Sequence, residues 1–187
     1  MKEAAKLDFL DGVKVLACLL VFNLHFVYLF YPGIYSLMPE QYHVPDIERF
    51  IGSTPLSLLM NGKYGARVFM TLSGFFVGYR FFTTGDKRSL KLGAIKKYFR
   101  LVFPILAVNV LIFVLMSLGL YKNGEASVFA HSEVFAANYN NFPPNLFAAV
   151  KEAVWGCFVT GANQYNGPIW FIYYEFFGTL LIAAILS

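Results

Sequence analysis

The sequence predicts an all-α protein, a multi-pass bundle of transmembrane helices. Of its 187 residues, 58% are hydrophobic and only 14% are charged, which is too apolar for an ordinary soluble domain of this length. A helix needs about 20 predominantly apolar residues to cross a bilayer. Four segments approach that requirement: 8–31, 64–82, 98–120 and 168–187. We therefore expect about four transmembrane helices.

The first segment, FLDGVKVLACLLVFNLHF, follows Lys2 and Lys6 as the core of a signal peptide would. Its apolar run is longer than the roughly 7–15 residues of such a core, and no small-residue cleavage site follows it. We interpret it as a retained helix. The second segment is the weakest of the four, because its unbroken apolar part begins only at Val68.

The last two segments enclose a region of mixed character. The helix-breaking sequence NYNNFPPN precedes residues 145–160, which are amphipathic with Lys151 and Glu152 on one side, so we expect an additional helix in the plane of the membrane interface. The final segment begins at NGPIW, where Pro168 suits a first helical turn. It ends in an apolar run without a flanking charge, and the chain is therefore expected to be the front part of a longer protein.

The distribution of charge predicts sidedness. Seven of the 15 Lys and Arg residues lie between residues 80 and 100, around a loop expected over 83–97. By the positive-inside rule, this loop and the N-terminus face the cytoplasm, and the loops 32–63 and 121–167 face the outside. Because the cations are concentrated here, the net charge of +4 does not indicate a nucleic-acid partner.

Two ionisable side chains interrupt the first apolar segment. Lys14 and His25 are eleven residues apart, about three helical turns, so they share one face and lie roughly 16 Å apart along the axis. Ionisable groups at membrane depth are costly and usually face a bundle interior or a wet cavity. Each residue also has a purely structural interpretation. Lys14 can pair with Asp11 and reach the inner headgroups, and His25 can be a neutral imidazole that is hydrogen-bonded to a neighbouring helix.

Glu175 is the second costly residue. It lies about 10 Å from the outer end of the last helix, and His25 lies about 9 Å from the outer end of the first, so the two can meet at one level. A carboxylate beside an imidazole raises its basicity and fixes its tautomer, as a general base requires. Helix adjacency is not visible in a sequence, so this pairing is a hypothesis.

Lys97 and Arg100 lie three residues apart at the expected start of the third helix, on one face. Such cations hold either anionic lipid headgroups or the phosphates of a cytoplasmic cofactor. In the second helix, Gly74 and Gly78 have the G-x-x-x-G spacing that favours close helix packing.

The remaining histidines and cysteines give no indication of a metal site. Cys18 and Cys157 are expected to be small apolar fillers at different depths. His43 and His131 fall in outer loops without nearby cysteines, so no zinc spacing occurs, and both are expected at the surface.

Four elements, in order, resemble the acyltransferase-3 family of integral membrane acyltransferases. The first helix resembles the family pattern of Arg or Lys, ten residues, then His, here Lys14 and His25. FMTLSGFFVGYRF resembles the segment FFxLSGFLI. KKYFRLVFP resembles an R-x-x-R element, with Lys97 in place of the first Arg. PIWFIYYEFFGTLL is similar to WSLxxExxFY at Trp170 and Glu175, with Phe171 in place of Ser.

This resemblance implies a domain of around ten transmembrane helices, of which the chain comprises the front part. It implies transfer of an acyl group, usually acetyl, from cytoplasmic acyl-coenzyme A to an outer hydroxyl, often of a cell-surface carbohydrate. The partners would be that acceptor and membrane lipids, with no nucleic acid and no metal, most simply in a bacterial plasma membrane. Pattern and resemblance together assign these candidate residues: catalytic His25 and Glu175, and cofactor-binding Lys14, Lys97, Arg100 and Arg80.

In the resulting mechanism, acyl-coenzyme A docks its phosphates on the inner cations and extends its thiol arm along the first helix. His25 acts as general base on the acceptor hydroxyl or carries the acyl group as a nucleophile, and Glu175 orients the imidazole. Two other classes of function stay open. One is a helical transporter in which His25 and Glu175 form a proton relay. The other is a membrane scaffold packed through G-x-x-x-G, which explains neither Lys14 nor His25.

Overall fold

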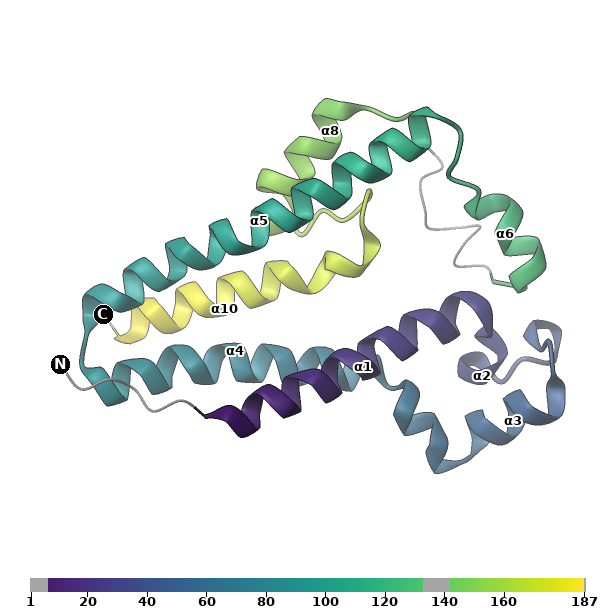
Figure 1. The fold of residues 1–187 in the computed structure, drawn as a ribbon, viewed down its shortest axis with the longest axis horizontal. Coiled ribbons are helices and arrows are strands. Elements are labelled where there is room, and N and C mark those ends of the chain that lie inside the picture. Colours follow the sequence, from purple (N-terminus) through teal and green to yellow (C-terminus); the bar gives the residue numbers. More distant parts are fainter. Residues whose placement is uncertain (1–6, 133–141, 187) are drawn as a thin grey trace. The chain divides into compact units, whose positions relative to one another are not determined.

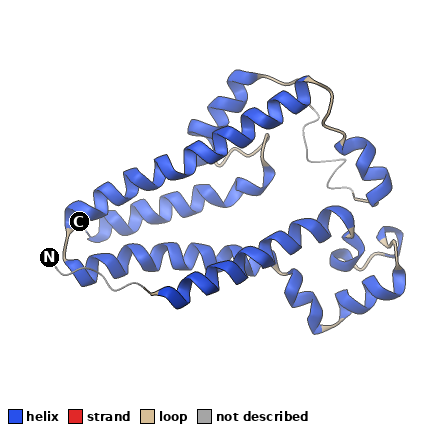
Figure 2. Cartoon of the chain, viewed as in Figure 1, coloured by secondary structure: helices blue, strands red, loops and turns tan. Residues whose placement is uncertain are grey.

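The computed structural model describes residues 7–132 and 142–186. These residues form helices joined by loops, with no strand in the described ranges (Figure 2), which confirms the predicted all-α class. The chain divides into two compact units. Among the described residues, the N-terminal unit comprises Asp8–Phe69 and 122–132, and the C-terminal unit comprises Leu7, Met70–Tyr121 and 142–186. Each unit is described by itself.

Long helices dominate the chain (Figure 1): α1 (Asp8–Phe30), α4 (Gly62–Thr84), α5 (Lys87–Ser117) and α10 (Trp170–Leu186). Three described segments are long and apolar enough to cross a membrane: Asp8–Phe30, Leu92–Ser117 and Gly167–Leu186. Within these segments, an apolar window of 18 residues is only 11%, 17% and 11% buried within the chain, so the apolar side chains point outward, as a lipid environment favours. Helix α4 does not reach this hydropathy, in agreement with its weaker signal in the sequence.

Helix α5 begins earlier than expected, and the loop predicted over 83–97 is wrong. Gly85, with φ of +66°, ends α4 in a left-handed conformation, and Asp86 directly follows it. The Asp86 Oδ1 accepts a hydrogen bond from the backbone N–H of Arg88 at 3.0 Å, which caps the new helix. The Lys, Arg, Leu and Ala residues that follow are strong helix formers, so the basic segment is helical although its hydropathy is low.

The loop expected over 32–63 contains the short helical pieces that its prolines allow. Helix α2 covers Pro32–Ser36, α3 covers Pro45–Ser53, and 3₁₀ turns cover Pro39–Gln41 and Pro55–Met60. Each begins with proline, whose fixed φ and missing N–H suit a first helical turn. Helix α6 (Asn123–Ala130) follows α5 along the chain and belongs to the N-terminal unit.

Within the N-terminal unit, glycines bring the first turns of α4 against α1. A Cβ added to Gly65 would lie 2.6 Å from the carbonyl oxygen of Ala17, and one added to Gly62 would lie 2.5 Å from Leu24 Cβ. Only glycine permits such an approach. No pattern in the sequence indicates this contact between α1 and α4.

The C-terminal unit packs α8 and α10 against α5 (Figure 1). Helix α8 (Leu146–Lys151) continues through a π-helical turn (Glu152–Gly156) into α9 (Cys157–Val159). The segment expected to lie flat in the interface therefore has a face buried against the long helices. Its two charged residues do not share a side as expected, because Lys151 is exposed and Glu152 is buried.

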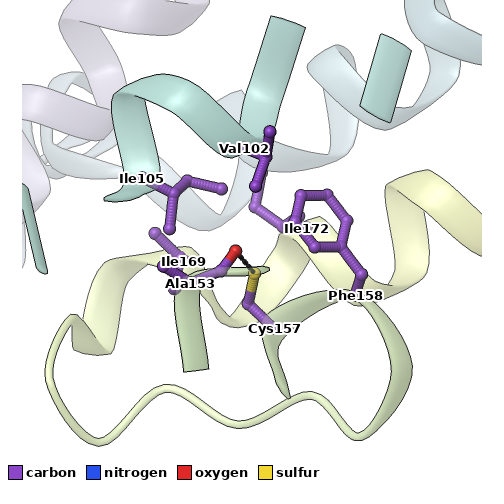
Figure 3. Packing of buried hydrophobic residues seen from close by; sticks show 7 residues of the cluster. All are labelled: Val102, Ile105, Ala153, Cys157, Phe158, Ile169 and Ile172. Carbon is purple, nitrogen blue, oxygen red and sulfur yellow. Dashed lines mark hydrogen bonds between the residues drawn. The ribbon is translucent and has the colours of Figure 1, made fainter. Parts of the chain in front are cut away.

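The core of this unit lies where these helices meet (Figure 3). Cys157 belongs to it and donates its thiol to the carbonyl of Ala153 at 3.4 Å, which confirms the expected role of this cysteine as a small buried filler. Cys18, by contrast, is exposed on α1. The buried cluster comprises Val102, Ile105, Ala153, Cys157, Phe158, Ile169 and Ile172.

Candidate functional site

His25 lies in the penultimate turn of α1, half-buried, with its ring bonded to its own helix. Its Nδ1 is 2.8 Å from the carbonyl oxygen of Val21. A carbonyl oxygen only accepts hydrogen bonds, so in the neutral imidazole Nδ1 carries the proton and Nε2 carries the lone pair. No partner of Nε2 is found among the residues that the structure describes. His25 therefore has the tautomer of a base without requiring a carboxylate to fix it.

Lys14 lies near the other end of α1, and its Nζ is 2.9 Å from Asp11 Oδ1. This is the local pairing considered from the sequence. Since α1 is continuous from Asp8 to Phe30, Lys14 and His25 share a face, and Ala17, buried, and Val21, half-buried, lie between them. Helix α4 contacts α1 beside this face: a Cβ on Gly65 would meet Ala17, Leu20 and Val21, and one on Gly62 would meet Leu20 and Leu24.

Lys97 forms a buried polar node in the C-terminal unit. Only 8% of its side chain is exposed, and its Nζ is 2.9 Å from Glu175 Oε1. The same ammonium donates to Thr179 Oγ1 at 2.8 Å and to the hydroxyl oxygen of Ser73. Side chains of α4 and α10 thus converge on one cation of α5. We call Lys97, Glu175, Thr179 and Ser73 the lysine node.

The contacts of the lysine node change the role expected for Lys97. An ammonium has three N–H donors, and the three oxygens of the node use them, so none is left for a phosphate. Lys97 also lies ten residues beyond the start of α5, about 15 Å along the axis, and not at the helix start as expected. Arg100 and Arg80 are exposed and keep their guanidinium groups accessible.

Sequence reasoning missed Ser73 and Thr179. Thr179 follows Glu175 by four residues on α10 and donates its hydroxyl to the Glu175 carbonyl at 2.9 Å, which leaves an oxygen lone pair for Lys97. The i, i+4 spacing of a carboxylate and a hydroxyl on an apolar helix is the signal in the sequence that could have identified this partner. Ser73 lies within FMTLSGFFVGYRF, where the resemblance gives it no role and only Gly74 and Gly78 are expected to pack.

A contact between Glu175 and His25 would join the two units and stays a prediction. The structure gives each of these residues another partner within its own unit: Lys97 for Glu175 and the Val21 carbonyl for His25.

A second buried polar group lies beside α5. Glu152, 6% exposed, accepts hydrogen bonds from the backbone N–H groups of Gln164 at 2.7 Å and Tyr165 at 3.0 Å. The Asn109 amide, fully buried, donates to Glu152 Oε1 at 3.2 Å. Burial, and beyond that the negative charge of Glu152, raises the pKa of the Cys157 thiol to about 12. Backbone partners leave no trace in a side-chain pattern, so the sequence did not reveal this group.

The outer-loop histidines of the N-terminal unit also differ from expectation. His131 is exposed as predicted, but His43 is half-buried and stacks on His131 with ring centroids 4.6 Å apart. Its Nε2 is 3.0 Å from the carbonyl oxygen of Ala130. The backbone N–H groups of His43 and Val44 donate to the buried carboxylate of Glu48 at 2.7 and 2.8 Å, so a local fold and not solvent holds this histidine.

The long apolar helices direct their side chains outward, and within these helices lie the His25 imidazole and the Lys97–Glu175 ion pair. These features define a helical membrane protein. The profile of the acyltransferase domain matches residues 7–187, and the chain belongs to the acyltransferase-3 family. Neither a curated protein nor a solved structure matches the chain. The family makes the protein a membrane acyltransferase in general.

Proposed function

We propose that the protein transfers an acyl group, acetyl in the simplest case, from cytoplasmic acyl-coenzyme A to a hydroxyl of a carbohydrate on the other side of the membrane. One observation carries this proposal: the Nδ1 of His25 is held by the Val21 carbonyl at 2.8 Å, so Nε2 presents a lone pair within an apolar helix. Among the candidate residues, His25 has the geometry of a general base.

In the proposed reaction, Nε2 of His25 removes the proton of the acceptor hydroxyl as its oxygen attacks the thioester carbonyl carbon. The new C–O ester bond forms, and the C–S bond breaks with its electron pair going to the sulfur. The imidazolium then returns the proton to the thiolate, which leaves as the coenzyme A thiol. The Val21 carbonyl is suited to stabilise the imidazolium, because Nδ1–H points at it throughout.

The donor phosphates require accessible cations. Arg80 and Arg100 fit, because both are exposed and a guanidinium binds a phosphate through two parallel hydrogen bonds. Lys14 is a weaker candidate because it already pairs with Asp11. Lys97 does not fit, because Ser73, Thr179 and Glu175 occupy its donors.

We assign Glu175 a positioning role through Lys97. A buried ion pair anchored by two hydroxyls fixes the rotation of α10 and α4 about α5, because any rotation would leave a charge without its partner. This assignment replaces the orientation of His25 by Glu175 in the proposed mechanism.

Transfer of radiolabel from acetyl-coenzyme A tests the proposal, with the full-length protein in membranes. His25→Ala should lower the transfer rate by about 10²–10⁴-fold, the usual contribution of a general base. His131→Asn is the matched control, since this exposed histidine has φ of 46°, which asparagine tolerates. Undiminished transfer by His25→Ala would refute the assignment.

A further inference from the structure

Residues 161–166, between α9 and the 3₁₀ turn Gly167–Ile169 that precedes α10, form a polar loop whose backbone is held by buried side chains. The Glu152 carboxylate accepts the successive N–H groups of Gln164 and Tyr165. Tyr165 is 2% exposed, and its hydroxyl exchanges two hydrogen bonds of 2.9 Å with the backbone of Asn145. The centre of the loop is therefore braced at two buried points.

The α8–α9 segment, which carries Glu152, has an irregular backbone where it contacts the loop. Glu152 opens the π-helical turn, a rare geometry that is frequent at functional sites. At the end of that turn, the carbonyl oxygen of Gly156 accepts from the N–H of Ala162 at 3.1 Å, which ties the beginning of the loop to the same helix. Gly161, with φ of +69°, makes the reversal.

The braced loop turns amide side chains outward. Gln164 is exposed and Asn166 is half-exposed, and neither amide has a partner among the described residues. Asn163 donates to the Gly167 carbonyl at 3.0 Å and keeps its own oxygen as an acceptor. The adjoining first turn of α10 presents Trp170, 45% exposed, in edge contact with Tyr174.

The chemistry of this surface is neutral. From residue 153 to residue 174 the sequence contains no Asp, Glu, Lys, Arg or His. Side-chain amides both donate and accept hydrogen bonds, as neighbouring hydroxyls of a sugar do. An exposed aromatic ring offers an apolar face to the C–H groups of a pyranose. A phosphorylated or carboxylated ligand would find no cation in this segment.

We propose that residues 163–170 bind the acceptor of the transfer, and that this acceptor is a neutral polyhydroxylated molecule, a sugar without charge at the bound unit. Glu152 is a positioning residue, because it holds the amide-bearing loop without touching the ligand. A loop ordered before binding loses little conformational entropy when the sugar binds. This inference rests on the proposed function. It adds that the acceptor is uncharged and that residues 163–170 bind it.

The test uses full-length protein and saturation-transfer NMR with methyl glucoside, methyl galactoside and methyl mannoside as neutral probes, and glucuronic acid as the charged one. Wild type should bind at least one neutral probe and not glucuronic acid. Removing two amides in Gln164→Ala/Asn166→Ala should weaken that binding by about tenfold or more, the equivalent of 1.4 kcal/mol. Gln41→Ala, which removes an amide from the N-terminal unit, should leave it unchanged.

Glu152→Gln tests the positioning role. Its NH₂ group would face N–H donors, so the loop should loosen, and the KM for the sugar should rise while the KM for acetyl-coenzyme A stays the same. A role in stability alone would reduce the amount of folded enzyme without separating the two KM values, and that result would remove Glu152 from the proposal.

The failures of the two proposals are distinguishable. Suppose that His25→Ala loses transfer, but that no neutral probe binds or that wild type and the double amide variant bind it equally well. This result would overturn the acceptor site alone. It would leave Trp170 and Tyr174 as an aromatic belt at the membrane interface. Sugar binding that depends on the amides, together with undiminished transfer in His25→Ala, would overturn the proposed chemistry alone.

Discussion

His25 and Lys97 are both costly groups inside apolar helices, yet their surroundings are opposite. Lys97 uses its donors on side chains of two other helices, with 8% of its own side chain exposed. His25 is half-buried and bonds only to the preceding turn of its own helix. A group satisfied on all sides serves to hold helices together, whereas a group held at one nitrogen keeps the other for chemistry. The contacts, and not the cost of burial alone, separate the two roles.

The largest effect on stability is expected from breaking the lysine node. Lys97→Ala leaves the Glu175 carboxylate, only 15% exposed, without its cation, which should destabilise the protein by about 3–5 kcal/mol. Thermal unfolding in detergent measures this change, with exposed Lys96→Ala as the matched control, expected within about 0.5 kcal/mol of wild type. A loss below about 1 kcal/mol would show that the node does not hold the helices.

Removing both charges sharpens this test. In Lys97→Met/Glu175→Leu no charge is left unpaired, and apolar replacements of buried ion pairs are often neutral or stabilising. We expect the double variant to regain most of the stability lost in Lys97→Ala. If it is no more stable than the single variant, the hydroxyls of Ser73 and Thr179 and not the charges dominate the node.

Gly74, next to Ser73, tests whether the node needs the close approach of α4 and α10. A Cβ at Gly74 would lie 3.1 Å from Ile182 Cδ1, so Gly74→Leu should overpack this contact and cost about 1–3 kcal/mol. Gly78→Leu is the matched control, because a Cβ there would meet only Phe82 of the same helix at 4.0 Å. Equal unfolding temperatures for the two variants would contradict the packing role of Gly74.

The smallest effect on stability is expected from the ionisation of the Cys157 thiol, which lies in the segment next to the loop 161–166. Burial first, and the charge of Glu152 second, raise the pKa of Cys157 from 9.0 to about 12, so the folded thiol stays protonated where an unfolded thiol ionises. The stabilising contribution of this neutral thiol is complete below pH 9 and is lost as the pH rises toward 12. Maleimide should therefore modify Cys157 only after unfolding, as peptide mapping would show. Rapid modification in the folded protein would mean that the α8–α9 segment opens.

The sequence predicted some parts of the molecule better than others. Helices α1 and α10 begin and end close to their expected bounds, because each is a single apolar run. Helix α4 also lies close to its expected bounds, although its unbroken apolar part begins only at Val68. The start of α5 was missed because the basic segment forms a helix through propensity and a cap at Asp86, neither of which raises hydropathy.

Among the site residues, the shared face of Lys14 and His25 follows directly from helical periodicity. The partners of Lys97 and Glu152 do not, because they lie on other helices and on the backbone, and only tertiary packing brings them together.

Acetyl transfer by two variants of equal foldedness, His25→Gln and Lys97→Met/Glu175→Leu, separates the roles of His25 and the ion pair most directly. We expect His25→Gln to lose about 10²–10⁴-fold in the rate of a single turnover, while the double variant stays within about tenfold of wild type. Transfer that survives in His25→Gln and disappears in the double variant would contradict this expectation, because the chemistry would then belong to the ion pair.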